Sequence, residues 1–148
     1  MKKILYLFTL VLFGFAPKIK DPAHWVFSIK NESGKLEIHF KAIVDKPWHI
    51  YSQIQPQESI STPTKIIFIK NPLIKMNGVL SEIGDKKTFT DQTIGVAQFF
   101  YADSVDFVQN LEVKGAVHTK LVGNITYQVC TDEMCLPAKT IPFSVDVP

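Results

Sequence analysis

The chain has 148 residues, of which 46% are hydrophobic and 20% are charged, and its formal net charge is +2. This length suits one domain, and the balance of apolar and charged residues excludes a disordered chain. All sixteen basic residues are Lys. Nucleic-acid binders depend on Arg contacts and on a basic face, so we expect no nucleic-acid partner.

The N-terminal segment has the composition of a targeting signal. Lys2 and Lys3 precede an apolar run from Ile4 to Ala16, which is shorter than the ~20 residues needed to span a bilayer. Small residues near the end of this run suit a signal peptidase. Residues 1–16 are therefore predicted to be a signal peptide, and residues 17–148 a single exported domain without stable membrane insertion. An uncleaved membrane anchor is the alternative.

The rest of the chain alternates apolar and polar residues with the period of a β-strand. The clearest alternation covers residues 25–29, 36–44, 125–129 and 141–147, and further β-rich runs cover 65–69, 74–80, 94–101 and 105–113. Turn-forming residues fill 31–34, 45–47, 55–63, 71–72, 84–91, 103–104 and 123–124. No apolar repeat of helical period follows the signal. The pattern predicts an all-β fold, an antiparallel immunoglobulin-like β-sandwich.

Cys130 and Cys135 are the two cysteines of the chain, and they lie in the segment ITYQVCTDEMCLPA. An immunoglobulin-type structural disulfide joins residues far apart in sequence, whereas this pair belongs to one hairpin or loop. The chain-entropy relation gives about 2 kcal/mol for a closed loop of about six residues, against about 4.7 kcal/mol for a hundred-residue loop. A pair that stabilises so little favours a redox role, with a structural hairpin disulfide as the alternative.

Strand parity predicts how the first cysteine is oriented. If Ile125, Tyr127 and Val129 face the core, Cys130 faces away from it, where a partner protein can reach it. Tyr127 is then a core residue. A metal site using the two thiols is a third alternative, although the spacing matches no standard zinc pattern. The four histidines that might complete such a site are scattered along the chain: His24, His39, His49 and His118.

Three segments carry a resemblance to a known family: TYQVCTDEMCLPA, VDKPWHIYSQ and KTFTDQTIGVAQFF. With them, residues 25–147 resemble the N-terminal periplasmic domain of the DsbD thiol:disulfide reductants. The resemblance implies an immunoglobulin-like fold, a periplasmic location and a redox-active disulfide without a bound cofactor. It also implies electron uptake from a thioredoxin-like domain and delivery to disulfide isomerases or cytochrome c maturation factors. Better-known members space their cysteines by one more residue.

The resemblance also assigns roles to individual residues. It implies that Cys135 forms the intermolecular disulfide and Cys130 resolves it. It further implies that Phe89 belongs to a cap loop and shields the disulfide, and that Tyr51 lies beside the cysteines. Trp48 is expected in the core, and His49 is a candidate hydrogen-bonding neighbour. Because the chain stops after this domain, we expect a separate membrane reductant.

The loop between the cysteines is acidic. Asp132 and Glu133 lie within it, and it contains no Lys, Arg or His. Negative charge disfavours a thiolate, so the pKa of each thiol is predicted to lie at or above the free value of about 8.5. The sequence therefore favours a protein-disulfide interchange domain that works with thioredoxin-like partners. The competing classes are an immunoglobulin-like binding or scaffold module and a periplasmic metallochaperone.

Overall fold

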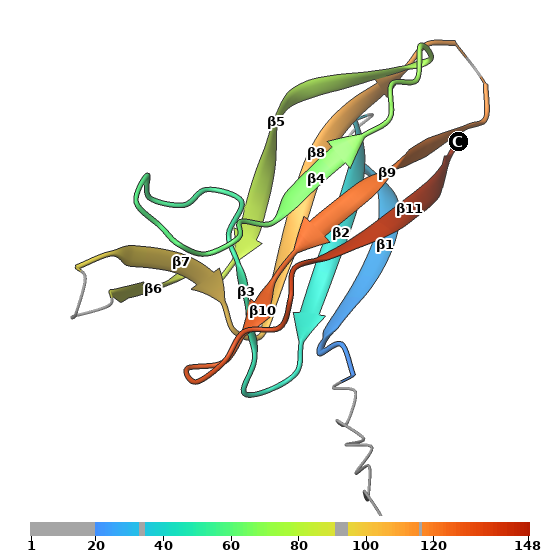
Figure 1. Ribbon diagram of the computed structural model, residues 1–148. Helices are drawn as coiled ribbons and strands as arrows, with labels where there is room; N and C mark the ends of the chain where they lie inside the picture. Colours follow the sequence, from blue (N-terminus) through green and yellow to red (C-terminus); the bar gives the residue numbers. More distant parts are fainter. Residues whose placement is uncertain (1–19, 33–34, 91–94, 116) are drawn as a thin grey trace, which may run out of the picture.

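The computed structural model describes residues 20–32, 35–90, 95–115 and 117–148, so the predicted signal peptide lies outside the described residues. The described residues form strands and loops (Figure 1), and none of them belongs to a helix that would cross a membrane. The strands are β1 (Ala23–Glu32), β2 (Lys35–Val44), β3 (His49–Tyr51), β4 (Lys65–Phe68), β5 (Ile74–Gly84), β6 (Lys87–Thr90), β7 (Ala97–Tyr101), β8 (Ser104–Val113), β9 (Thr119–Tyr127), β10 (Val129–Cys130) and β11 (Lys139–Val147).

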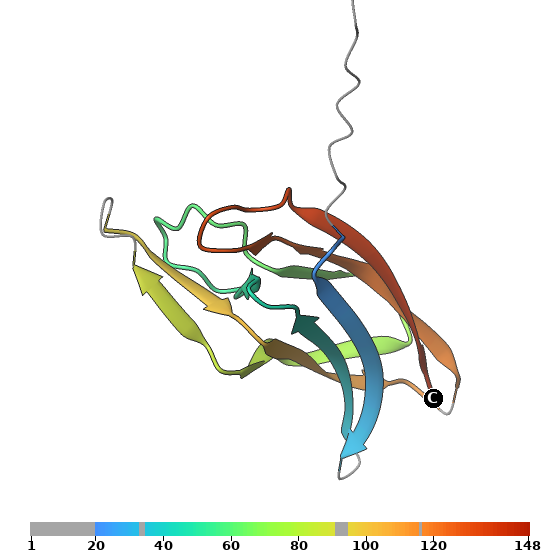
Figure 2. The same cartoon turned by 90° about the horizontal axis from the view of Figure 1, so that it is seen from below.

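The strands form three antiparallel sheets, ordered β1-β2-β8-β5, β11-β9-β4 and β10-β3-β7-β6. The first two are the layers of a sandwich, seen from below in Figure 2. Aromatic rings join these layers: Phe40 on β2 lies 4.8 Å from Phe143 on β11 and 5.8 Å from Phe68 on β4, between ring centroids. At the other end, Trp25 on β1 lies 5.3 Å from Tyr127 on β9. The predicted all-β sandwich is confirmed.

The alternation seen in the sequence accounts for the core. In β9 the buried positions recur every second residue, and Tyr127 is 2% exposed, as predicted. Trp48 is half-buried and packs against the core. The buried apolar cluster draws its members from both layers and the third sheet: Ala23, Ile38, Phe40, Ala42, Val44, Ile50, Tyr101, Val105, Phe107, Leu111, Leu121, Ile125, Tyr127, Val129, Phe143 and Val147.

Two segments predicted as turns are strands. The 84–91 run contains β6, which pairs with β7 although all four of its residues are exposed. Gly123 lies in the middle of β9, between Phe143 on β11 and Phe68 on β4. A Cβ there would lie 2.5 Å from Phe143 Cζ and would meet the carbonyl oxygen of Ile67. The glycine therefore makes room for close packing across the sheet rather than forming a turn.

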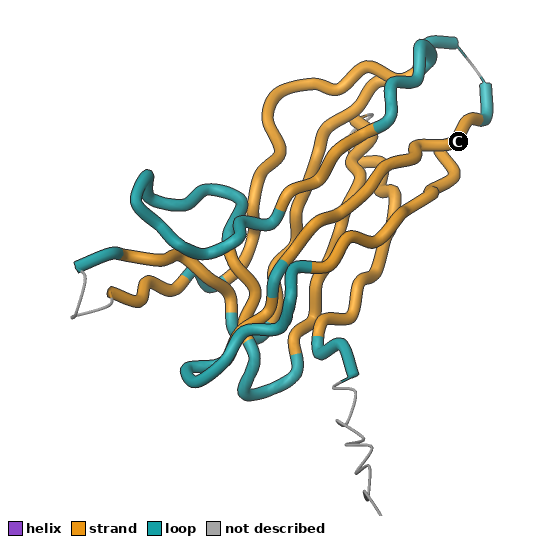
Figure 3. The backbone as a smooth tube through the Cα atoms, viewed as in Figure 1, coloured by secondary structure: helices purple, strands orange, loops and turns teal. Residues whose placement is uncertain are grey.

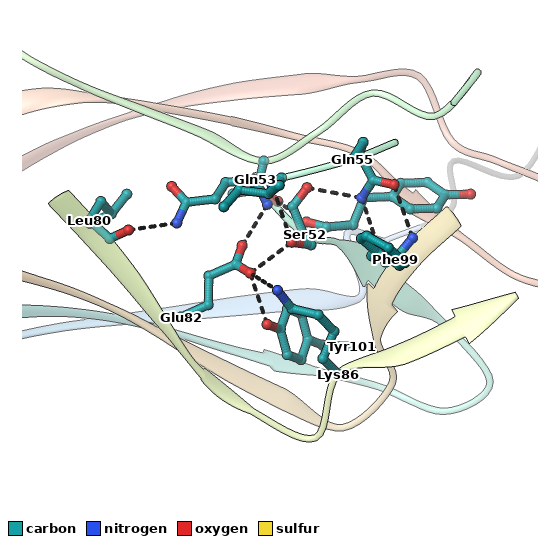
Figure 4. Close-up of polar contacts among 11 residues, drawn as sticks. Ser52, Gln53, Gln55, Leu80, Glu82, Lys86, Phe99 and Tyr101 are labelled. Atoms are coloured by element: carbon teal, nitrogen blue, oxygen red, sulfur yellow. Dashed lines mark hydrogen bonds and ion pairs between the residues drawn. The ribbon is translucent and has the colours of Figure 1, made fainter. Parts of the chain in front are cut away.

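A buried carboxylate fastens the long loop after β3 to the sandwich. Glu82 on β5 accepts hydrogen bonds from Ser52 Oγ at 2.7 Å, from the Gln53 N–H at 2.6 Å and from the Tyr101 hydroxyl at 2.9 Å (Figure 4). Lys86 Nζ lies 2.8 Å from the same carboxylate, whose side chain is only 4% exposed. The start of the loop, drawn in teal in Figure 3, is thereby held against β5 and β7.

The charge of Glu82 is stabilised despite its burial. Burial alone would raise the pKa of this carboxyl group, but the hydrogen bonds from Lys86, Ser52, Gln53 and Tyr101 together lower it below the ordinary value of 4.5. The charged form is therefore favoured by folding. Its contribution to stability is fully present above the unfolded-state pKa and is lost as the pH falls through the folded-state value.

We expect Glu82→Gln to lower the free energy of unfolding at neutral pH by about 1–3 kcal/mol, because charge-assisted hydrogen bonds are replaced by weaker ones. The wild-type protein should also lose more stability than the variant as the pH falls below about 5. Urea unfolding over a pH series measures both effects. The control is Glu112→Gln, which removes an exposed carboxylate 3.7 Å from Lys75 Nζ. Parallel pH profiles for wild type and Glu82→Gln would contradict the assignment.

Candidate redox site

The third sheet places several of the residues singled out in the sequence on one face. In its register, Cys130 is opposite His49, Tyr51 is opposite Phe100, and Phe89 is opposite Gln98. Directly opposed residues share a face, and so do alternate residues of one strand. One face therefore carries Cys130, His49, Tyr51, Phe100, Gln98 and Phe89. The neighbouring residues Val129, Ile50 and Tyr101 belong to the buried core.

The two cysteines close a tight hairpin. Cys130 and Cys135 form a disulfide with their Cα atoms 4.0 Å apart, and they pair as an antiparallel bridge. Thr131 shapes the loop: its N–H donates to the Met134 carbonyl at 2.7 Å, and its Oγ1 accepts from the N–H groups of Glu133 and Met134 at 3.2 and 3.1 Å. A Thr hydroxyl commonly stabilises such a turn. The hairpin is therefore held by backbone contacts as well as by the disulfide.

The two cysteines differ sharply in exposure. Cys130 is 1% exposed, whereas Cys135 is exposed. Cys130 is on the face of β10 opposite to Val129, as strand parity predicted, but it is buried there. The prediction that a partner can reach it is wrong, because the face turned away from the core is itself covered at this position. Cys135 is the cysteine that a partner can approach.

A cavity of about 400 Å³ lies beside the hairpin. Its walls come from the third sheet and from the cysteine loop: His49, Tyr51, Phe89, Gln98, Phe100, Thr131 and Asp132. Four residues proposed from the sequence thus meet here, namely His49, Tyr51, Phe89 and Asp132. Phe89 is 54% exposed, so its side chain is only partly covered. Glu133 is exposed in the same loop and is not among the lining residues.

Aromatic contacts and burial set the electrostatics of the cavity. The His49 ring lies 4.5 Å from Phe100 and 5.4 Å from Tyr51, between centroids. Burial lowers the pKa of His49, and the charge of Asp132 offsets part of this effect. Burial also raises the pKa of Tyr51. At neutral pH the cavity therefore holds a neutral imidazole and a neutral phenol, and Asp132 is among the residues that line it.

Sequence reasoning missed three lining residues: Gln98, Phe100 and Thr131. Gln98 and Phe100 alternate on β7, but their relation to the cysteines depends on the short strand β3, which lies between β10 and β7. Thr131 offered a local signal, since a Thr directly after a cysteine can stabilise a turn. In the described residues, no group of three His, Cys, Asp or Glu side chains is arranged to hold a metal ion.

Gln128, next to the hairpin, connects it with the long loop after β3. Its Nε2 donates to the Leu136 carbonyl at 3.1 Å, and its Oε1 accepts from the Thr62 N–H at 3.3 Å. The Leu136 N–H in turn donates to the Val129 carbonyl at 3.0 Å. The residue that separates β9 from β10 therefore also anchors the outgoing strand of the hairpin.

The family model of the thiol:disulfide interchange protein DsbD, N-terminal region, matches residues 17–146. This chain belongs to that family. The resemblance found in the sequence is thus confirmed. A comparison with curated proteins finds no match.

Solved structures show the same fold at low identity. The DsbD N-terminal domain of Neisseria meningitidis in its reduced form is 17% identical, with a TM-score of 0.51, over 83% of this chain and 85% of that one. The N-terminal periplasmic domain of ScsB from Proteus mirabilis is 16% identical, also with a TM-score of 0.51, over 86% of this chain and 47% of that one. The chain therefore spans about half of the ScsB structure.

Proposed function

We propose that this protein carries out thiol–disulfide exchange through Cys130 and Cys135. The observation that carries the proposal is the asymmetry of the disulfide, in which an exposed cysteine is bonded to a buried one at the edge of the sandwich. A partner can approach Cys135, while Cys130 stays protected within the domain. Membership of the DsbD N-terminal family supports this function.

The exchange proceeds in two balanced steps. A partner thiolate attacks Sγ of Cys135, so that a partner–Cys135 disulfide forms, the Cys130–Cys135 bond breaks, and Cys130 leaves as a thiolate that takes up a proton. A second partner thiolate, from the same protein, then attacks the partner sulfur and releases Cys135. The domain has gained two electrons and two protons, and the partner has been oxidised to a disulfide. The reverse sequence delivers the electrons.

We further propose thioredoxin-like proteins as the partners and the periplasm as the location. The aromatic cavity beside the hairpin gives such a partner an apolar surface next to the attacked sulfur. The ScsB domain with the same fold is described as periplasmic. A disulfide persists in that compartment, which also supports the predicted export signal. We also propose that a membrane reductant supplies the electrons.

The competing function is a scaffold module with a structural disulfide, and the reduction potential separates the two. We expect the pair to equilibrate with a glutathione or dithiothreitol buffer at a potential well above the roughly −300 mV typical of structural disulfides. Because the closed loop is short, the reduced domain should keep its fold. The measurement is thiol labelling in redox buffers, with circular dichroism of both states. A potential below that range, or unfolding on reduction, would favour the scaffold.

The exposure difference predicts unequal reactivity of the two thiols. A Cys130→Ser variant should form a lasting mixed disulfide with oxidised glutathione through Cys135, because the exposed thiol reacts and no second thiol resolves the product. The matched Cys135→Ser variant should react far more slowly, because Cys130 is buried. Mass spectrometry over time measures both reactions. Similar rates would show that burial does not select the attacked cysteine.

Phe89 is proposed to shield the disulfide. Phe89→Ala should accelerate reduction of the disulfide by dithiothreitol several-fold, because the ring forms part of the wall beside the hairpin. Stability should change by no more than about 0.5 kcal/mol, since the side chain is largely exposed. The control is Thr88→Ala, one residue earlier on β6 and directed to the opposite face. A rate equal to that of the control would exclude Phe89 from the site.

A further inference from the structure

His49 is the residue directly opposite Cys130 in the pairing of β3 with β10. The Cβ atoms of such opposed residues lie about 4.5–5.5 Å apart, and their side chains share one face of the sheet. His49 also lines the cavity with Asp132, which belongs to the cysteine loop. The sheet therefore places an imidazole beside the cysteine that solvent does not reach.

The His49 imidazole is held in place by contacts between aromatic rings. Phe100 and Tyr51 contact the ring from the same face of the sheet. Within the described residues, no hydrogen bond or ion pair engages its nitrogen atoms, in contrast to His39, whose Nδ1 lies 2.8 Å from Asp106 Oδ2. The nitrogens of His49 are therefore available for a proton from the cavity.

Formation of a thiolate at Cys130 requires a neighbouring base. A thiolate formed at a site that is 1% exposed is disfavoured by the loss of water. The loop that follows it contributes negative rather than positive charge, through Asp132 and Glu133. The other titratable groups on the His49 face are the neutral phenol of Tyr51 and the amine of Lys87, which is opposite Phe100 and lies 4.0 Å from Asp85. Among the groups named, the imidazole is the base suited to neutral pH.

We propose that His49 accepts the proton of Cys130 when this cysteine resolves a mixed disulfide, and returns it when the disulfide is reduced. This inference rests on the proposed exchange function. In the resolving step the S–H bond of Cys130 breaks and its proton passes to the imidazole. The resulting thiolate attacks Sγ of Cys135, and the partner leaves as a thiolate. The carboxylate of Asp132 stabilises the imidazolium formed. Because burial keeps the imidazole neutral at neutral pH, the base is present in its active form.

The test is the pH dependence of ring closure. Cys135 of the reduced protein is first converted to its mixed disulfide with glutathione at about pH 4 by an activated glutathione–pyridyl disulfide. This reagent supplies the disulfide bond and releases pyridine thione, and it reacts at a pH where ring closure is slow because the Cys130 thiolate is scarce. The pH is then raised to values between about 5 and 9, and glutathione release is followed. With His49, the rate should level off above the imidazole pKa. In His49→Gln it should keep rising with pH towards the thiol pKa, and at pH 7 it should be at least about tenfold slower than wild type.

Matched variants separate proton transfer from a structural role. His49→Asn repeats the loss with a smaller amide, and both variants should match wild type in rate at high pH. His118→Gln removes an exposed histidine outside the cavity and should keep the wild-type profile. Parallel profiles for wild type, His49→Gln and His49→Asn, or an equal loss of rate at every pH, would overturn the role of His49. Failure of the wild-type mixed disulfide to close would instead overturn the exchange function itself.

Discussion

The site depends on a transfer of the chain from one sheet to another within two residues. β9 is the central strand of the sheet β11-β9-β4 and ends at Tyr127, while β10 begins at Val129 and pairs with β3. Tyr127 and Val129 are both buried in the core, so the alternation of faces continues across Gln128. Cys130 is consequently fixed on the opposite face of a strand that the core itself holds in place. The position of the hairpin is therefore set by two core residues that precede it, Tyr127 and Val129.

The same constraint explains how β3, which is only three residues long, positions residues of the site. Ile50 packs into the core, so His49 and Tyr51 must point to the face that carries Cys130. Directly after β3, Ser52 and Gln53 bind the buried carboxylate of Glu82. A short strand is easily displaced, but this one is fixed by its core residue and by the polar cluster that follows. The cavity beside the disulfide is therefore preorganised by contacts outside it.

The sequence predicted what depends on regular alternation and local motif. The long strands, the core position of Tyr127 and the cysteine hairpin were all recognisable, because each repeats a pattern over adjacent residues. β3 and β6 were not, since three or four residues carry too little periodicity and β6 is exposed throughout. Gly123 was predicted to be a turn residue. The reason for a glycine at this position is instead the ring of Phe143, which is distant in sequence and leaves no room for a Cβ. The burial of Cys130 was missed because alternation assigns a residue to a face without showing what covers that face.

Contacts in the core, and not the disulfide, join the two layers of the sandwich. This arrangement favours a role of the disulfide in exchange over a role as a structural cross-link. The layers are joined by aromatic contacts such as Phe40 with Phe143, which lie in the sandwich and not at the hairpin. The hairpin has its own backbone hydrogen bonds, from Thr131 to Met134 and from Leu136 to Val129. Opening the disulfide removes a constraint on only about six residues, worth about 2 kcal/mol in the chain-entropy relation. The fold therefore has little need of the disulfide, and the geometry protects one sulfur while presenting the other. Such an arrangement suits a bond that is repeatedly opened and closed by other proteins.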